Sequence, residues 1–155
     1  MTLEQELQAE QVSHLDLRGF SCVSSGTTVR ETVDKMRADQ HNVCLVTADD
    51  KLVGIFTDRD VLQKVAPNRE LLDQPIDNVM TANPITIRPD SSAATALRLM
   101  DDHKFRNLPA VDADGHIVGS MTHQSIINYL ATRYPVEVQN HPPRPDQFPS
   151  KAEGG

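Results

Sequence analysis

Hydrophobic positions along the chain follow one pattern twice. In each copy a short apolar strand precedes a helix-spaced run, then two apolar strands around an Asp-containing turn, then a second helix-spaced run. The first copy predicts these five elements at residues 21–23, 29–36, 43–47, 52–56 and 58–65. The second copy predicts them at residues 85–87, 93–100, 108–111, 117–121 and 123–130. Hydroxyl residues immediately before both first helices, at Thr27/Thr28 and Ser91/Ser92, are typical helix N-caps.

The two copies are similar in sequence as well as in pattern. A shift of 65 positions aligns residues 42–65 with 107–130, and seven of the 24 pairs are identical. Farther upstream the shift is 64, which aligns Met36 with Met100. The sequence therefore predicts an α/β (α+β) fold built from tandem β-α-β-β-α repeats. Half-size units of this kind would stack to bury their apolar faces, which gives a pseudo-twofold module.

The remaining segments divide the chain into five parts. We expect an N-terminal helix at 1–16, with Leu3 and Leu7 on one face, repeat 1 at 17–68 and repeat 2 at 79–134. Pro67, Asn68 and Pro75 punctuate the connection between the repeats, where we expect a linker at 69–78. The tail at 135–155 is rich in Pro and Gly and is predicted to be disordered.

Net charge and hydropathy exclude some classes of function. The net charge of -7 opposes binding to nucleic acid or to an anionic membrane surface. No apolar run is long enough to span a membrane, and no signal peptide is evident, so we expect a cytoplasmic protein. In that reducing compartment Cys22 and Cys44 are expected to be buried free thiols.

The segment Gly54–Asp60 carries the clearest candidate chemistry. It runs from a strand into a helix start, where unpaired N–H groups favour an anion such as phosphate. The Thr57 hydroxyl and the Arg59 guanidinium could bind phosphate, and the Asp60 carboxylate could accept hydrogen bonds from both hydroxyls of a ribose. The same Thr-x-x-Asp spacing also resembles a capping box that stabilises the helix without a ligand. Both roles can coexist.

The stretches GIFTDRDVLQKV and VMTANPITIRPDSSAATALRLM, followed by NLPAVDADGHIVGSMT, resemble the cystathionine-β-synthase (CBS) domain family. The resemblance covers about residues 15–132, in the form typical of small bacterial proteins with one CBS pair. It implies two clefts between the repeats for ligands such as AMP, ADP, ATP, S-adenosylmethionine or NAD(H), and it implies a homodimer. Thr57 and Asp60 would then be the phosphate-side and ribose-binding residues.

The resemblance also implies that each cleft is completed by the opening strand of the other repeat. The Asp60 site would be walled by Met80, Thr81, Pro84, Ile85 and Thr86, with Arg106 facing phosphate. Ile85 could equally be a core residue. A second, weaker site would use Cys22, Val23, Thr122 and Ser125, where Ser125 replaces the ribose-binding carboxylate.

Among four classes of function, a nucleotide-sensing regulatory module fits the motif best. The alternative is a structural dimerisation module with a vestigial cleft. The sequence has no catalytic motif, so we expect no enzyme. We also expect no metal site, no required cofactor, no nucleic-acid or membrane partner, and an effector protein as a candidate downstream partner.

Overall fold

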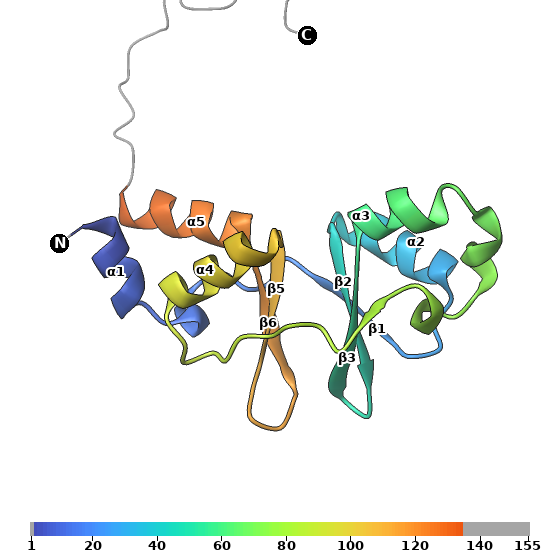
Figure 1. Cartoon of the computed structure of the whole chain (residues 1–155), viewed down its shortest axis with the longest axis horizontal. Coiled ribbons are helices and arrows are strands. Elements are labelled where there is room, and N and C mark those ends of the chain that lie inside the picture. Colours follow the sequence, from blue (N-terminus) through green and yellow to red (C-terminus); the bar gives the residue numbers. More distant parts are fainter. Residues whose placement is uncertain (1, 135–155) are drawn as a thin grey trace, which may run out of the picture.

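The computed structural model describes residues 2–134, so the predicted tail at 135–155 lies outside the described residues. Two α/β halves lie side by side, with helices along one side and two β-hairpins projecting from the other (Figure 1). The first half contains β1 (Ser21–Ser24), α2 (Val29–Asp39), β2 (Val43–Ala48), β3 (Lys51–Thr57), α3 (Asp58–Asp60), its π-helical continuation η2 (Val61–Val65) and β4 (Thr81–Ala82). The second half contains α4 (Ala93–His103), β5 (Asn107–Val111), β6 (Ile117–Thr122) and α5 (His123–Arg133). The predicted α/β fold is confirmed.

The helix starts follow from the hydroxyl caps. Thr28 accepts a hydrogen bond from the N–H of Glu31 at 3.1 Å, and Ser92 accepts one from Thr95 at 3.1 Å. Each cap satisfies an N–H group that has no partner inside the helix. At the opposite ends of α2 and α4, Gln40 and Lys104 adopt the left-handed conformation and turn the chain into the next strand.

The first sheet has the order β1-β2-β3-β4, with β1 parallel to β2 and the other pairs antiparallel. The second sheet is the antiparallel pair of β5 and β6. The expected strand at 85–87 is reduced to a single parallel bridge between Ile87 and Ala110. The strand that the sequence did not predict is β4, which pairs with β3 at Gly54 and Ile55.

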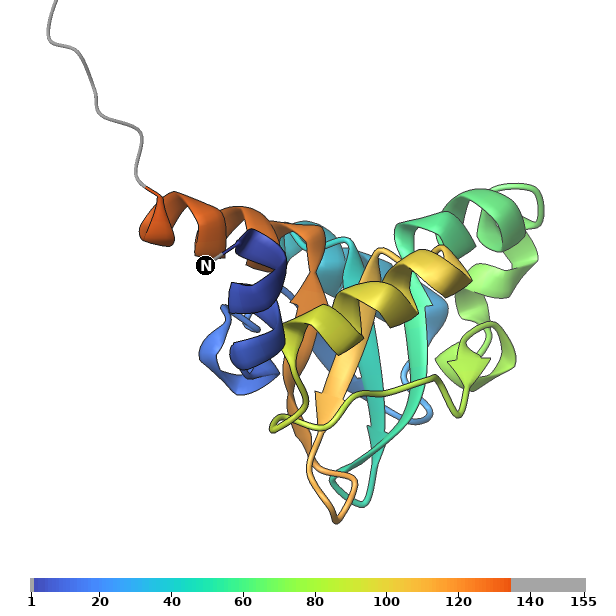
Figure 2. The same ribbon diagram turned by 60° about the vertical axis from the view of Figure 1, so that its left-hand side comes forward.

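Each half is completed by the segment that precedes the other half. Leu7, Val12, Leu15 and Leu17 belong to the apolar core of the second half. The Ser120 N–H donates to the Leu17 carbonyl at 2.9 Å, much as β4 adds to β3. Figure 2 shows the result, with α1 (Leu3–Ala9) beside α4 and α5. Of the two leucines expected on one face of this helix, Leu7 is buried and Leu3 is 40% exposed.

The connection between the repeats also packs as part of the first half. It forms two short 3₁₀ turns, η3 (Arg69–Asp73) and η4 (Ile76–Asn78). Ile76 is fully buried in the apolar core of the first half, which we call the first core, and its N–H donates to the Thr27 carbonyl at 2.6 Å. The two hairpins meet at their turns, where the Leu52 N–H donates to the Gly115 carbonyl at 3.1 Å. This bond joins the two halves at the hairpin turns.

Candidate functional site

A cleft of about 340 Å³ lies between the two halves, and we call it the first cleft. It is walled by the end of β3, the start of α3, the chain after β4 and the entry to β5. Its lining residues are Ile55, Thr57, Asp58, Arg59, Asp60, Thr81, Asn83, Pro84, Ile85, Lys104, Phe105, Arg106, Asn107 and Pro109. This volume lies near the lower end of the range for small-molecule sites.

The structure brings most of the predicted site residues to the first cleft. Thr57, Arg59, Asp60, Thr81, Pro84, Ile85 and Arg106 line it. Met80 and Thr86 do not. Met80 is partly buried against the first core and lies over Gly54, where an added Cβ would be 2.8 Å from its Cε.

Asp60 is held in a fixed position at the cleft. Its Oδ2 accepts a hydrogen bond from the Thr57 N–H at 3.0 Å, so the predicted capping interaction is present. Its Oδ1 lies 3.1 Å from Lys64 Nζ, which also donates to the Val79 carbonyl at 2.8 Å. The Asp60 side chain is 15% exposed, which leaves part of the carboxylate facing the cleft. The cap orients the carboxylate without enclosing it.

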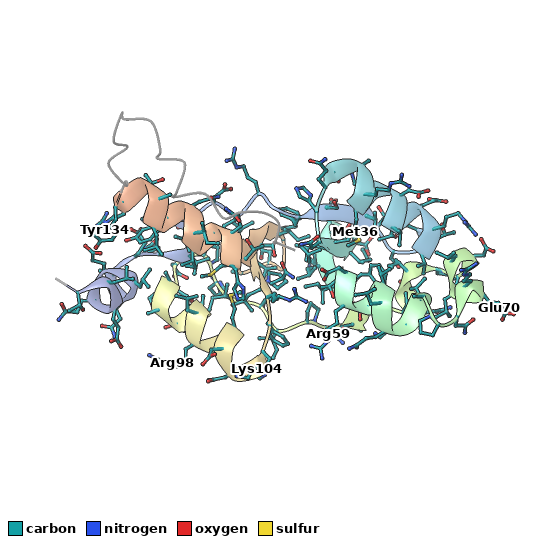
Figure 3. All side chains as sticks on the ribbon, turned by 90° about the horizontal axis from the view of Figure 1, so that it is seen from above. Met36, Arg59, Glu70, Arg98, Lys104 and Tyr134 are labelled. Atoms are coloured by element: carbon teal, nitrogen blue, oxygen red, sulfur yellow. The ribbon has the colours of Figure 1, made fainter. Side chains whose placement is uncertain are left out.

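Three basic side chains border the same cleft. Arg59 comes from the first half, whereas Lys104 and Arg106 come from the second. In Figure 3, Arg59 and Lys104 lie on the same side of the molecule. Within residues 2–134, neither arginine takes part in an ion pair. Lys104 has one long pair, in which its Nζ lies 4.0 Å from the carboxylate of the exposed Asp101. Exposed pairs of that kind contribute little, so all three cations are available to an anion.

Sequence reasoning missed several of these positions. Lys104 and Phe105 follow α4, where the left-handed Lys104 turns the chain toward the cleft. Phe105 supplies an aromatic ring that stacks on His103 with 5.1 Å between ring centroids. In the sequence, the end of this helix is indicated only by the last helix-spaced apolar residue, Met100. Asn83 also lines the cleft and has a positive φ of 50°.

A second cleft of about 400 Å³ occupies the pseudo-symmetric position. Thr122, His123 and Gln124 take the places that Thr57, Asp58 and Arg59 have in the first cleft, and Gln40, His41 and Asn42 correspond to the entry to β5. The complete lining is Gly19, Gln40, His41, Asn42, Val43, Asp58, Arg106, Asn107, Thr122, His123, Gln124 and Ile127.

Of the four residues predicted for the second site, only Thr122 lines this cleft. Val23 packs against the first core, and Cys22 is half-buried on the same strand. Ser125 is 2% exposed. Its Oγ accepts from the Thr122 N–H at 3.0 Å and donates to the Asp16 carbonyl at 2.6 Å. The hydroxyl is therefore occupied by the fold. Gly19 lies at the cleft instead, between Arg18 and Phe20, where the Phe20 N–H donates to the Arg18 carbonyl at 2.8 Å.

A larger open groove, of about 1040 Å³, lies beside α5 and away from the predicted residues. Asp16 is on its wall. The Arg18 guanidinium, aided by the Arg18 backbone N–H and by Asn128, lowers the pKa of Asp16 to about 2. The Asp16 carboxylate in this groove is therefore paired with Arg18, whose Nε lies 2.9 Å from its Oδ1.

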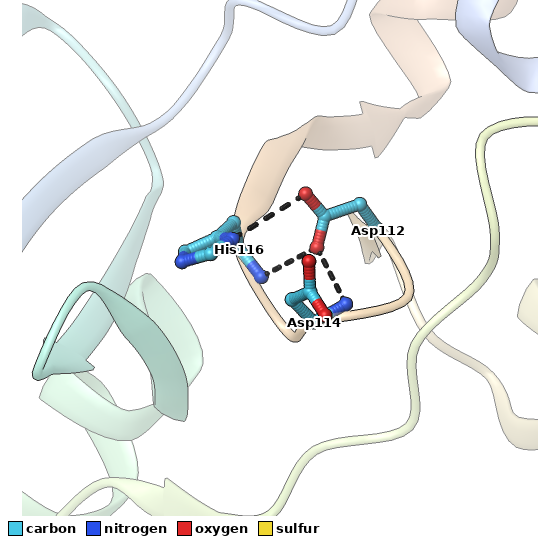
Figure 4. Close-up of side chains that lie close together, drawn as sticks. All are labelled: Asp112, Asp114 and His116. Carbon is cyan, nitrogen blue, oxygen red and sulfur yellow. Dashed lines mark hydrogen bonds and ion pairs between the residues drawn. The ribbon is translucent and has the colours of Figure 1, made fainter.

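Asp112, Asp114 and His116 form a small cluster in the β5–β6 turn (Figure 4). Their potential ligand atoms all lie within 4.8 Å of one another. The Asp112 Oδ1 accepts hydrogen bonds from the N–H groups of Asp114 and His116, both at 2.9 Å. These bonds lower the pKa of Asp112 and account for the turn, so we assign no metal to the cluster.

Known proteins share this arrangement of repeats. The family model described as the CBS domain matches residues 12–67 and again residues 76–132. The chain belongs to the CBS domain family. CBS domain-containing protein CBSCBSPB3 from Arabidopsis thaliana is 38% identical over 109 residues, which cover 69% of this chain and 19% of that protein. The chain spans about a fifth of the length of the first curated relatives that it matches.

Solved CBS structures share the fold. CBS domain protein PAE2072 from Pyrobaculum aerophilum, solved in complex with AMP, is 25% identical with a TM-score of 0.68, covering 79% of this chain and 98% of that one. An uncharacterised protein from Pyrococcus horikoshii reaches a TM-score of 0.72 at 25% identity, covering 85% of this chain and 98% of that one.

One relative carries an enzyme's name, arabinose 5-phosphate isomerase KdsD from Pseudomonas aeruginosa, and the chain covers 37% of it at 32% identity. The matched family model describes the CBS domain and no catalytic domain. Among the described residues, no helix has the length and apolar character needed to cross a membrane.

Proposed function

We propose that this chain is a regulatory module that binds an adenosine-containing nucleotide in the first cleft. The observation that carries the proposal is the Asp60 carboxylate, which is fixed by its bond to the Thr57 N–H and faces a cleft bordered by three cations. A carboxylate can accept hydrogen bonds from both hydroxyls of a ribose, and nearby cations suit the phosphate that the ribose carries.

The apolar members of the cleft suit the base. Ile55, Pro84 and Ile85 lie on the walls, and Ile85 is 40% exposed rather than packed in a core. A flat adenine ring can be enclosed by such side chains, while neighbouring backbone groups read its edge. Two CBS relatives, each 25% identical to this chain, were solved in complex with AMP, which supports the same ligand class here.

A regulatory role requires the ligand to favour one arrangement of the module over another. The first cleft is formed by both repeats, so a nucleotide that contacts both changes how tightly they are held together. An effector protein, or further segments of a longer chain, would respond to that change. No catalytic role is part of the proposal.

The test is thermal unfolding with AMP, ADP, ATP, S-adenosylmethionine, NAD and NADH in separate samples. A ligand at 100 times its dissociation constant stabilises by about 2.7 kcal/mol, which raises the midpoint by roughly 5–10 °C. Asp60→Asn keeps an oxygen for the Thr57 cap but removes the charge, and it should lose most of this rise. The matched control is Asp34→Asn, which removes a carboxylate from an exposed position on α2 outside the cleft. A rise that survives Asp60→Asn would refute the assigned site.

A homodimer is the second candidate role, and it could operate with or without a nucleotide. Leu62 and Ile127 occupy equivalent positions in the two repeats and are 70% and 54% exposed. Leu62 belongs to η2 and Ile127 to α5. In Figure 1, α5 lies on the helical side of the molecule, as does the helical segment that continues α3. Exposed apolar side chains at symmetric positions suit a twofold contact. Light scattering of the wild type and of a Leu62→Gln/Ile127→Gln variant measures the mass; an unchanged dimer mass would exclude this face.

A further inference from the structure

The first and second clefts share a wall. Asp58, Arg106 and Asn107 line both of them. With volumes of about 340 and 400 Å³, the two clefts meet at these side chains. A ligand that fills the first cleft and extends past Arg106 therefore enters the second.

The second cleft retains groups for an anion but has lost the group for a ribose. Ser125 replaces the carboxylate, and its hydroxyl is buried between the Thr122 N–H and the Asp16 carbonyl. The cleft keeps Thr122 at the start of the 11-residue helix α5, and the N-terminal end of a helix carries the positive end of its dipole. His41 and His123 add imidazoles that can donate to an anion, and Arg106 adds a permanent charge.

We propose that a single nucleotide occupies both clefts, with its nucleoside in the first cleft at Asp60 and its polyphosphate passing Arg106 into the second. This inference rests on the proposed function and specifies its ligand as a nucleoside polyphosphate. The second cleft is then a phosphate compartment and not another nucleoside site. A nucleoside monophosphate lacks the further phosphates that would extend past Arg106, and a sulfonium such as that of S-adenosylmethionine meets Arg59 and Arg106 with the wrong charge.

Asp58 is the carboxylate on the shared wall and would repel free phosphate. Mg²⁺ is commonly held by one or two carboxylates together with the phosphates of a nucleotide. A magnesium ion carried by the polyphosphate would offset the Asp58 charge, so the probe must be the magnesium complex of ATP.

The experiment is calorimetric titration of the full chain with adenosine, AMP, ADP and ATP in excess Mg²⁺. We expect one nucleotide per chain, with ATP bound more tightly than AMP by about tenfold or more, since the added phosphates gain charge-assisted contacts. Gln124→Glu places a negative charge in the second cleft at the start of α5, where an acidic residue favours the helix. It should weaken ATP binding about tenfold and reduce AMP binding much less.

Thr95→Glu is the matched control. It makes the same change of charge in the first turn of α4, another 11-residue helix, at an exposed position outside both clefts. It should leave the ratio of ATP to AMP affinity unchanged.

The outcomes separate this inference from the proposed function. If no nucleotide binds, or if binding does not depend on Asp60, the proposed function fails and the inference with it. If nucleotides bind at Asp60 but AMP and ATP bind equally, the shared-cleft inference alone is wrong. Two nucleotides per chain, or an equal loss of AMP and ATP in Gln124→Glu, would also overturn it.

Discussion

Gly54 and Gly119 occupy the same position in the two repeats, but they face different kinds of atoms. A Cβ added at Gly119 would lie 2.7 Å from the carbonyl oxygen of Leu17 and 3.3 Å from its carbonyl carbon. The three atoms nearest to a Cβ at Gly54 all belong to the Met80 side chain, including Cγ and Cε at 2.8 Å. Backbone cannot move aside as a methionine side chain can.

The Gly119→Ala substitution should therefore be much more costly than Gly54→Ala. Displacing Leu17 breaks its hydrogen bond with the Ser120 N–H, and Ser120 is fully buried. An unsatisfied buried donor costs about 1–3 kcal/mol, and overpacking adds about 1–3 kcal/mol. We expect a loss of about 3 kcal/mol, or a midpoint lower by roughly 10 °C. At Gly54 a rotation of Met80 and a less flexible unfolded chain should keep the loss below about 1 kcal/mol.

Urea and thermal unfolding of the wild type and both variants provide the assay. The comparison is internal because both substitutions add one methyl group to a strand glycine. Equal losses of stability, or a larger loss for Gly54→Ala, would refute the role of Leu17 and its carbonyl in completing the second half. A changed m-value would show that the substitution had altered the compactness of the unfolded or folded state or had broken two-state behaviour.

Two further predictions concern titrating groups. Burial raises the pKa of the Cys44 thiol to about 12 and also raises that of Cys22. Since the thiolate is the reactive form, Cys44 should resist iodoacetamide at pH 8 until the chain unfolds, as mass spectrometry would show; rapid labelling of folded Cys44 would contradict its burial. Arg18 lowers the Asp16 pKa from 3.8 to about 2, so the stabilisation is complete above the unfolded pKa and is lost as pH falls toward 2. Asp16→Asn should lower the unfolding midpoint at pH 6 but not at pH 2, and a pH-independent difference would count against the pairing.

Much of the fold could be predicted because its signals are local. The hydroxyls of Thr28 and Ser92 begin both helices as expected, and the apolar runs around residues 43–56 and 108–121 form the two hairpins. Helix caps and alternating apolar runs depend on residues a few positions apart, so a sequence shows them directly. The capping bond between Asp60 and Thr57 belongs to the same class.

The missing parts depend on contacts between distant segments. Nothing local indicates that Leu17 lies against Gly119, or that β4 adds to β3, because each joins a segment to an edge formed elsewhere in the chain. Contacts between distant segments also explain the differences at the second cleft. Cys22 and Val23 do not line it, and Ser125 is buried against the Asp16 carbonyl. Alignment of the repeats identified the residue types in the second cleft, but not which of them face it.

If Asp60 holds a nucleotide in the first cleft, the affinity of AMP must differ between the wild type and Asp60→Asn. Hydrogen bonds to a charged acceptor contribute about 1.5–3 kcal/mol each, so we expect the substitution to weaken AMP binding by roughly tenfold to a hundredfold. The folded stability without ligand should change by less than about 1 kcal/mol, because the cap survives and the pair with Lys64 is partly exposed. An unchanged AMP affinity in Asp60→Asn would contradict this role. If the wild type bound no adenine nucleotide at all, Asp60 would be left with its role in the helix cap.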